Sequence, residues 1–140
     1  LKKFKINFTN KDFFFSDCEM TEINGLFATK FKKIPLLNPD LIYLDGPDQF
    51  NIKGKIRNFT ISHKDMMPMV SDILDIEYFL TPGTIILIDG RTANARFLND
   101  NFKRKWDYKY LESLDLNIFF LNEKPLGKYN RRQLKFYNFI

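Results

Sequence analysis

The 140-residue sequence has a single cysteine and lacks a long apolar run. One cysteine cannot form an internal disulfide bond, which is typical of proteins from a reducing compartment. No apolar run approaches the ~20 residues that a membrane-spanning helix needs, and the first residues do not form a secretory signal. These absences predict a cytoplasmic protein without a membrane partner.

The sequence also lacks a concentrated cationic block. It contains 22 Lys and Arg against 17 Asp and Glu, for a formal net charge of +5. Such an excess is typical of proteins that bind nucleic acid or anionic substrates. Here, however, the short basic runs are spread over residues 2–3, 32–33, 103–105 and 131–132. We therefore expect a small-molecule substrate and no dedicated nucleic-acid surface.

Apolar residues are abundant enough for one hydrophobic core. They make up 44% of the sequence and include sixteen phenylalanines, as in globular rather than disordered proteins. No repeat, low-complexity tract or linker divides the chain, so we expect residues 1–140 to form a single domain. Because the sequence begins with Leu1 instead of methionine, we expect this domain to be the C-terminal part of a larger one.

The hydrophobic pattern predicts strands that alternate with helices. Apolar or alternating runs predict strands at residues 12–15, 26–31, 41–44, 84–88, 106–112 and 116–122. An apolar stripe at helical spacing predicts a helix over residues 64–80, and Thr92 is expected to cap a second helix that ends at residue 102. Residues 46–62 are expected to form a long loop.

This order of elements predicts an α/β fold with parallel strands flanked by helices. The runs at residues 41–44 and 84–88 are uninterrupted, which is typical of parallel strands covered on both faces. The last two strands are joined by a short turn, so they are predicted to form an antiparallel C-terminal hairpin.

Each of the two uninterrupted runs ends on an aspartate followed by glycine. The segments are "LIYLDG" at residues 41–46 and "IILIDG" at residues 85–90. Ligands of open α/β sheets bind beyond the carboxyl ends of the strands, and neighbouring strands lie about 4.8 Å apart. Asp45 and Asp89 are therefore predicted to converge on one ligand. The alternative is that each aspartate only forms a turn with its glycine.

Four segments carry a resemblance to a known family: "FFFSDCEM", "PDLIYLDGPD", "FLTPGTIILIDG" and "LNIFFLNEKPLG". In their order and spacing, residues 12–127 resemble the second half of a class I S-adenosylmethionine-dependent methyltransferase. The resemblance implies a partial Rossmann-like sheet whose fourth and fifth strands are residues 41–44 and 84–88. It also implies that Asp17, with its neighbour Cys18, contacts the adenine of S-adenosylmethionine, and that Asp45 lies at the cofactor and the reacting atoms.

The sequence departs from the family pattern in two places. The glycine-rich turn of the family's first half is absent, so we expect it upstream of Leu1, within two strand–helix units. Metal-dependent O-methyltransferases hold a divalent cation with an aspartate after the fourth strand and an Asp-Asn pair after the fifth. Asp45 and Asp89 match the first two positions, but Gly90 occupies the third. A cation such as Mg²⁺ retains several waters and needs few carboxylates, so a metal site at Asp45 and Asp89 stays an alternative.

Three further residues are candidates for the chemistry. His63, the single histidine, could remove the proton of a substrate hydroxyl because its pKa lies near neutrality. Arg91 and Asn94 follow Asp89 where a substrate would lie, and an arginine can hold a phosphate or carboxylate. The alternatives are an ordinary exposed histidine and a solvated first helical turn. Cys18, taken by itself, is typical of a small packing residue.

These observations lead us to expect a methyltransferase that acts on a hydroxyl of a small molecule or sugar. The isolated 140-residue piece is expected to be inactive, and a homo-oligomer is one alternative for its oligomeric state. Two alternatives come from other classes of protein. One is a metal-dependent sugar-nucleotide transferase, and the other is a non-enzymatic α/β module whose aspartates only form turns.

Overall fold

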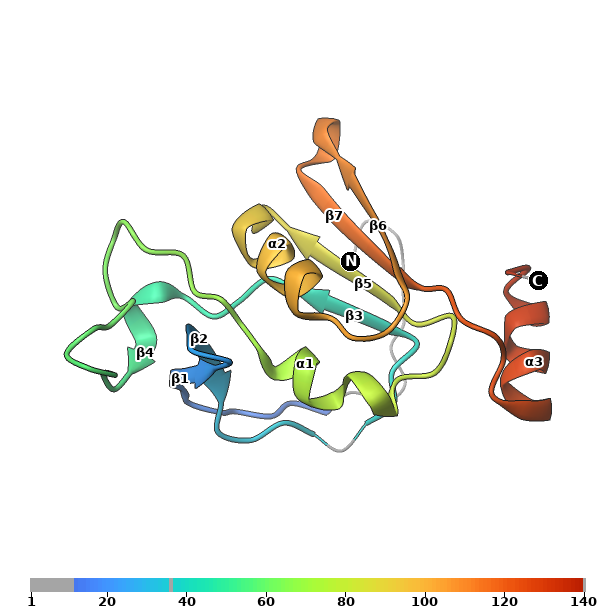
Figure 1. Ribbon diagram of the computed structural model, residues 1–140, viewed down its shortest axis with the longest axis horizontal. Helices are drawn as coiled ribbons and strands as arrows, with labels where there is room; N and C mark the ends of the chain where they lie inside the picture. Colours follow the sequence, from blue (N-terminus) through green and yellow to red (C-terminus); the bar gives the residue numbers. More distant parts are fainter. Residues whose placement is uncertain (1–11, 36, 140) are drawn as a thin grey trace.

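A computed structural model of the chain describes residues 12–35 and 37–139. Within these residues the chain forms two small mixed sheets and three α-helices (Figure 1). This arrangement confirms an α/β fold. In the described part of the chain, no helix is long and apolar enough to cross a membrane.

The first sheet has three strands in the order β2-β1-β4. Strands β1 (Cys18–Ile23) and β2 (Leu26–Phe31) form an antiparallel hairpin, and the short β4 (Ile52–Lys53) pairs with β1 in parallel. The hairpin turns at Asn24 and Gly25, which both have positive φ angles, of 51° and 79°. Asn-Gly is the preferred dipeptide for such two-residue turns because both residues tolerate this conformation.

The prediction of a strand at residues 12–15 was wrong. Phe13 and Phe15 are 91% and 89% exposed, and residues 12–17 have no regular secondary structure. The strand begins instead at Cys18, three residues after the predicted end at Phe15. There, buried Cys18 and Met20 alternate with exposed Glu19, so one face of the hairpin packs on a small core with Ile52. The expected strand at residues 26–31 is confirmed as β2.

The second sheet has four strands in the order β3-β5-β7-β6. Strands β3 (Leu41–Leu44) and β5 (Ile85–Asp89) are parallel neighbours. Strand β7 (Leu116–Leu121) runs antiparallel to both β5 and β6 (Trp106–Leu111). The predicted C-terminal hairpin is therefore confirmed, and a short 3-10 turn, Glu112–Leu114, joins its strands.

The predicted helix at residues 64–80 is mostly absent. Helix α1 covers only Asp72–Ile76, followed by the 3-10 turn Glu77–Phe79. The preceding segment bonds to β2 instead: the Thr29 N–H donates to the Met69 carbonyl at 2.8 Å, and the Ser71 N–H donates to the Thr29 carbonyl at 3.0 Å. These long-range backbone bonds hold the segment extended, although its apolar spacing favours a helix.

Helix α2 (Thr92–Asn101) confirms the second predicted helix, with one correction at its start. Arg91, and not Thr92, occupies the N-cap position. The Thr92 hydroxyl instead lies 3.3 Å from the amide nitrogen of Asn117 on β7. The predicted long loop after β3 contains the 3-10 turn Gln49–Asn51 and strand β4.

Helix α3 (Gly127–Phe136) was not predicted. Its Leu134 packs against Gly83, directly before β5. The φ angle of Gly83 is +96°, a conformation that favours glycine, and a Cβ atom there would also force Leu134 Cδ2 to move. Figure 1 shows α3 beyond the amino ends of β3 and β5, on the side away from the three-stranded sheet.

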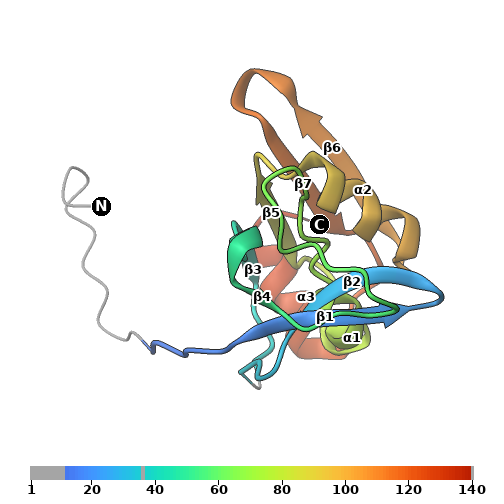
Figure 2. The ribbon, with the colours of Figure 1, turned by 90° about the vertical axis from the view of Figure 1, so that its left-hand side faces the viewer.

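Helices α1 and α2 cover one face of the four-stranded sheet. The core between them contains Ile86, Ile88, Leu98 and Phe119, all fully buried. The three-stranded sheet lies across one end of the molecule (Figure 2). Strand β3 is the edge of its sheet, with Leu41 55% exposed and Tyr43 56% exposed. The prediction that residues 41–44 are covered on both faces was therefore wrong.

Candidate functional site

Asp45 and Asp89 lie at the same edge of the four-stranded sheet. Leu44 pairs with Ile88 in the parallel register of β3 and β5. Asp45 directly follows β3, and Asp89 is the last residue of β5. Asp45 is exposed and Asp89 is half-buried. The carboxyl ends of these two strands thus place the two aspartates at the same level of one sheet edge. That they converge on one ligand stays a prediction.

Tyr43 completes this group of side chains. Its hydroxyl donates a hydrogen bond to Asp89 Oδ2. This bond, partial desolvation and the negative charges of Asp89 and Asp45 raise the pKa of the phenol to about 12. Tyr43 therefore stays protonated and acts as a donor. Sequence reasoning missed it, although strand alternation places Tyr43 on the same face as Asp45.

A second tyrosine–aspartate pair lies beside Gly90. The Tyr110 hydroxyl donates to Asp115 Oδ1 at 2.9 Å, and the Gly90 N–H donates to the Asp115 carbonyl at 2.9 Å. The hydrogen bond to Asp115 raises the pKa of Tyr110. No pattern in the sequence indicated this pair, because the β6–β7 turn reaches Gly90 only through the pairing of β5 with β7.

Arg91 links the end of β5 to the segment after β3. One guanidinium nitrogen, Nη2, donates to the Pro47 carbonyl at 2.6 Å, and Nη1 lies 3.6 Å from Met67 Sδ. Burial lowers the pKa of the guanidinium, and the charges of Asp45 and Asp48 oppose that change. Arg91 thus supplies a partly desolvated positive charge close to the carboxylates of Asp45 and Asp48.

Asn94 lies in the interior of the molecule. It is fully buried, and its side-chain amide forms two bonds to the backbone of Val70. Oδ1 accepts from the Val70 N–H at 3.0 Å, and Nδ2 donates to the Val70 carbonyl at 3.2 Å. In this position Asn94 fixes the extended segment before α1.

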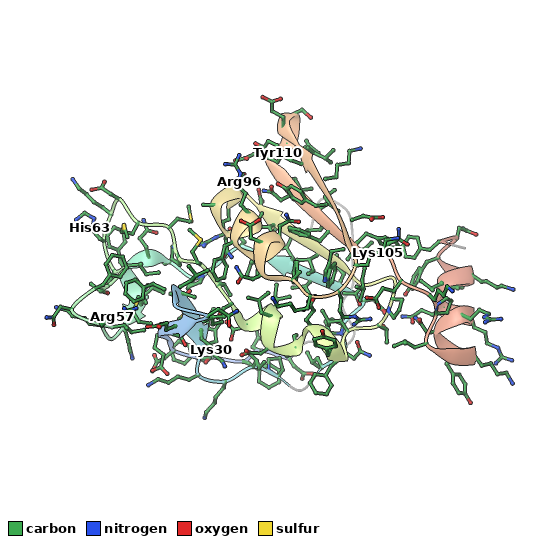
Figure 3. All side chains as sticks on the ribbon, viewed as in Figure 1. Lys30, Arg57, His63, Arg96, Lys105 and Tyr110 are labelled. Atoms are coloured by element: carbon green, nitrogen blue, oxygen red, sulfur yellow. The ribbon has the colours of Figure 1, made fainter. Side chains whose placement is uncertain are left out.

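His63 lies away from the two aspartates. Figure 3 shows it on the long segment that follows β4. Its Nδ1 accepts a hydrogen bond from the Asp65 N–H at 3.2 Å and lies 3.5 Å from the Asp65 carboxylate. Among the hydrogen bonds and ion pairs of the described residues, none joins His63 to Asp45 or Asp89.

Cys18 begins strand β1 of the three-stranded sheet, and Asp17 directly precedes it. Asp17 Oδ1 lies 2.7 Å from Lys53 Nζ, and this hydrogen bond lowers the pKa of the carboxyl group. The Cys18 thiol is buried in the small core, and burial raises its pKa to about 11. The structure thus keeps Asp17 accessible, whereas the side chain of Cys18 points into the protein. No hydrogen bond or ion pair within residues 12–35 and 37–139 joins either residue to Asp45.

No group of three or more His, Cys, Asp or Glu side chains that could hold a metal ion occurs in the described residues. Asp45 and Asp89 provide two carboxylates, and the Tyr43 hydroxyl already occupies one oxygen of Asp89. A cation held by this pair would need water or substrate oxygens for its remaining ligands.

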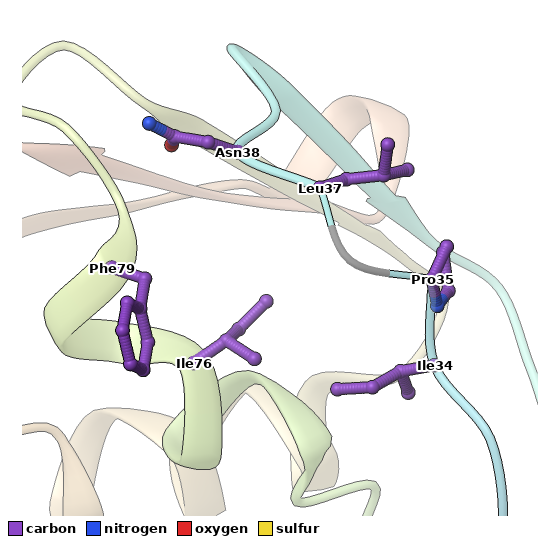
Figure 4. Close-up of a pocket in the computed structure, with 6 residues that line it drawn as sticks. All are labelled: Ile34, Pro35, Leu37, Asn38, Ile76 and Phe79. Carbon is purple, nitrogen blue, oxygen red and sulfur yellow. The ribbon is translucent and has the colours of Figure 1, made fainter.

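A separate apolar cavity lies between α1 and the segment that precedes β3. It has a volume of about 480 Å³, and Figure 4 shows the residues that line it: Ile34, Pro35, Leu37, Asn38, Ile76 and Phe79. None of these side chains is charged, and neither aspartate is among them. The cavity is therefore not part of the carboxylate site.

Comparison with known protein families, with curated protein sequences and with solved structures found no match for this chain.

Proposed function

We propose that the chain is part of an S-adenosylmethionine-dependent methyltransferase that acts on a hydroxyl of a small molecule or sugar. The observation that carries the proposal is the position of Asp45 and Asp89 at the carboxyl ends of two neighbouring parallel strands, where Asp89 accepts a hydrogen bond from the Tyr43 hydroxyl. Ligands of open α/β sheets bind at this edge.

The four-stranded sheet supports the Rossmann-like part of the proposal. The strands in the fourth and fifth positions of the resemblance, β3 and β5, are parallel neighbours. They are followed in the chain by the antiparallel pair β6 and β7, as the resemblance implies. A larger parallel sheet would extend from the edge of β3, which no strand within the described residues occupies.

The accessible carboxylates fit a cofactor that carries amino and hydroxyl groups. S-adenosylmethionine would supply an electrophilic methyl group. Asp45 is exposed, and no described residue donates a hydrogen bond to its side chain, so its oxygens are available as acceptors. Asp17 offers a second accessible carboxylate beside Lys53. Cys18 does not fit a cofactor contact through its thiol, because that group is buried.

Asp89 is the residue best placed to accept the proton of a substrate hydroxyl. In the structure it accepts a hydrogen bond from the Tyr43 hydroxyl, and a substrate hydroxyl would donate to Asp89 in the same way. A positioned carboxylate that accepts this proton increases the nucleophilicity of the oxygen. In this proposal Asp89 replaces His63 as the base, since the partner of His63 is Asp65. Arg91 would hold an anionic group of the substrate near the same edge.

Nuclear magnetic resonance tests the proposal without requiring activity. We expect S-adenosylhomocysteine, added to the ¹⁵N-labelled chain, to shift the amide signals of Asp45, Gly46, Asp89 and Gly90. Asp45→Asn should weaken this binding, whereas Asp100→Asn, an exposed position on α2, should leave it unchanged. A folded protein that shows no shifts at these four amides would contradict the proposal.

The same titration separates the alternatives. Shifts produced by Mg²⁺ with a nucleoside diphosphate, and not by S-adenosylhomocysteine, would favour the metal-dependent sugar-nucleotide transferase. The absence of shifts with either ligand would favour a module whose aspartates only form turns.

A further inference from the structure

The segment that contains α3 carries the entire excess of positive charge. Residues 124–139 hold five of the 22 cationic side chains and none of the 17 acidic ones, so the rest of the chain has 17 of each. The five are Lys124, Lys128, Arg131, Arg132 and Lys135, and all are exposed. The basic residues are therefore less evenly distributed than the short runs of the sequence suggested.

Four of these cations lie on one face of the helix. Lys128, Arg131, Arg132 and Lys135 follow one another at positions i, i+3, i+4 and i+7, which share one side of an α-helix. At 1.5 Å per residue they form a stripe about 10 Å long. No acidic side chain in the described part of the chain lies within salt-bridge distance of these four residues.

Two aromatic side chains border this cationic stripe. Tyr129 is 82% exposed and Phe136 is 79% exposed. They are seven residues apart, so they lie on the same side of the helix as each other, next to the stripe. Exposed rings beside a row of cations are the components with which proteins bind single-stranded nucleic acid, because the cations contact phosphates and the rings stack on bases.

The remaining side of α3 packs on the rest of the protein. Leu134 is buried against Gly83, and Asn130 donates to the Pro82 carbonyl at 2.9 Å. Gln133 donates to Asp40, whose carboxylate also accepts from the Tyr137 hydroxyl at 3.4 Å. The apolar side of the helix is thus occupied, and only cations and two rings face outward.

We propose that the exposed face of α3 binds single-stranded nucleic acid. A helix that binds a membrane surface buries its apolar face in the lipid, but here that face is already packed on the protein. A base-paired duplex keeps its bases stacked and would leave Tyr129 and Phe136 without partners. Single-stranded nucleic acid provides phosphates for the cations and unpaired bases for the rings.

This surface is distinct from the carboxylate site. Helix α3 contacts Gly83 and Asp40, which precede β5 and β3, whereas Asp45 and Asp89 lie at the other ends of these strands. The inference therefore does not depend on the proposed methyl transfer, and either can fail without the other.

Fluorescence anisotropy of a labelled 12-residue uridine oligoribonucleotide tests the proposal with the whole chain. Replacing all four cations of the stripe with Gln should reduce the slope of log affinity against log salt concentration by about 3, since each phosphate contact contributes about 0.7. A matched variant removes four exposed lysines elsewhere: Lys33, Lys55, Lys64 and Lys109. It has the same net charge and should retain the slope of the original chain.

The rings are tested separately. Tyr129→Ala and Phe136→Ala should each weaken binding about tenfold, a typical effect of losing one stacked base. Replacing the exposed Phe13 and Phe15 with Ala should leave the affinity unchanged, and Arg131→Lys with Arg132→Lys should retain most of the binding.

Four results would overturn the inference. The first is an equal loss of oligonucleotide binding in the two charge variants, and the second is an equal affinity for a 12-base-pair duplex and for the single strand. The third is the absence of binding at low salt. The fourth is binding to phosphatidylserine vesicles in place of the oligonucleotide.

Discussion

The hydroxyl of Tyr43 donates a hydrogen bond to the carboxylate of Asp89 across the β3–β5 strand pair. This bond joins the ends of two strands that are 46 residues apart in the sequence. It fixes the Asp89 carboxylate at the sheet edge where Asp45 also lies. The proposed site thus contains a carboxylate that already accepts a hydrogen bond from a hydroxyl group.

Asp89→Asn should lower the pKa of Tyr43. The hydrogen bond to Asp89 is the largest cause of the rise to about 12, so its loss should return the phenol toward its ordinary value of 10.0. The pKa can be followed by NMR with ¹³C-labelled tyrosine, and Tyr43→Phe identifies the signal. A phenol that still titrates near pH 12 in the variant would show that Asp89 does not cause the rise.

Asp72→Asn should flatten the dependence of stability on pH. Asp72 is 6% exposed, and its carboxylate accepts the Phe31 N–H at 3.0 Å. Burial raises its pKa from 3.8 to about 6, so between these values the folded state binds more protons than the unfolded state. The free energy of unfolding should therefore fall as pH rises through this range.

Urea unfolding between about pH 4.5 and pH 6.5 measures this effect. The lowered pKa values of Asp17 and Glu123 act mainly below this range, because their contribution is lost as pH falls through their folded values. Asp100→Asn serves as the control and should behave like the original chain. A variant at Asp72 with an unchanged pH profile would assign the dependence to other groups.

Glu77→Ala should destabilise the fold by about 3 kcal/mol, since it leaves several partly buried donors without an acceptor. The Glu77 carboxylate is 2% exposed. It accepts from the Arg104 N–H at 2.8 Å, the Lys103 N–H at 3.0 Å and Trp106 Nε1 at 3.0 Å. Glu77→Gln keeps one acceptor oxygen and should cost less. Urea unfolding of both variants decides the matter, and equal stabilities would indicate that these bonds contribute little.

Leu41→Lys should reduce self-association of the chain. Leu41 is 55% exposed on β3, an edge strand that presents unpaired backbone groups, and exposed apolar edges promote pairing between chains. Sedimentation velocity over a range of protein concentrations measures the association. Leu114→Lys, at a 65% exposed position in the β6–β7 turn, is the control. Equal association of the two variants would exclude the β3 edge as the contact.

Local patterns were sufficient for several elements. The apolar run of β5 and the alternation and short turn of the β6–β7 hairpin were predicted from the sequence. The start of α2 was predicted within one residue. In each case the propensity of the segment agrees with its tertiary environment, so nearby residues determine the structure.

Other elements could not be predicted because distant residues determine them. The segment before α1 has helical spacing, but its backbone bonds to Thr29 and to the Asn94 side chain hold it extended. The alternation of buried and exposed residues in β1 arises only when β1 pairs with β2, so the residues of β1 alone do not define the strand. Helix α3 is short, and its apolar contact is with Gly83, about fifty residues earlier in the chain.

The candidate site divides in the same way. The sequence by itself determined that Asp45 and Asp89 each end an apolar strand, since a run of apolar residues followed by Asp-Gly is a local pattern. Only the tertiary structure decided that the two strands are parallel neighbours, that Tyr43 donates to Asp89, and that His63 lies elsewhere. Strand pairing joins residues more than forty positions apart, and hydrogen bonds between strands depend on register, which no single segment encodes.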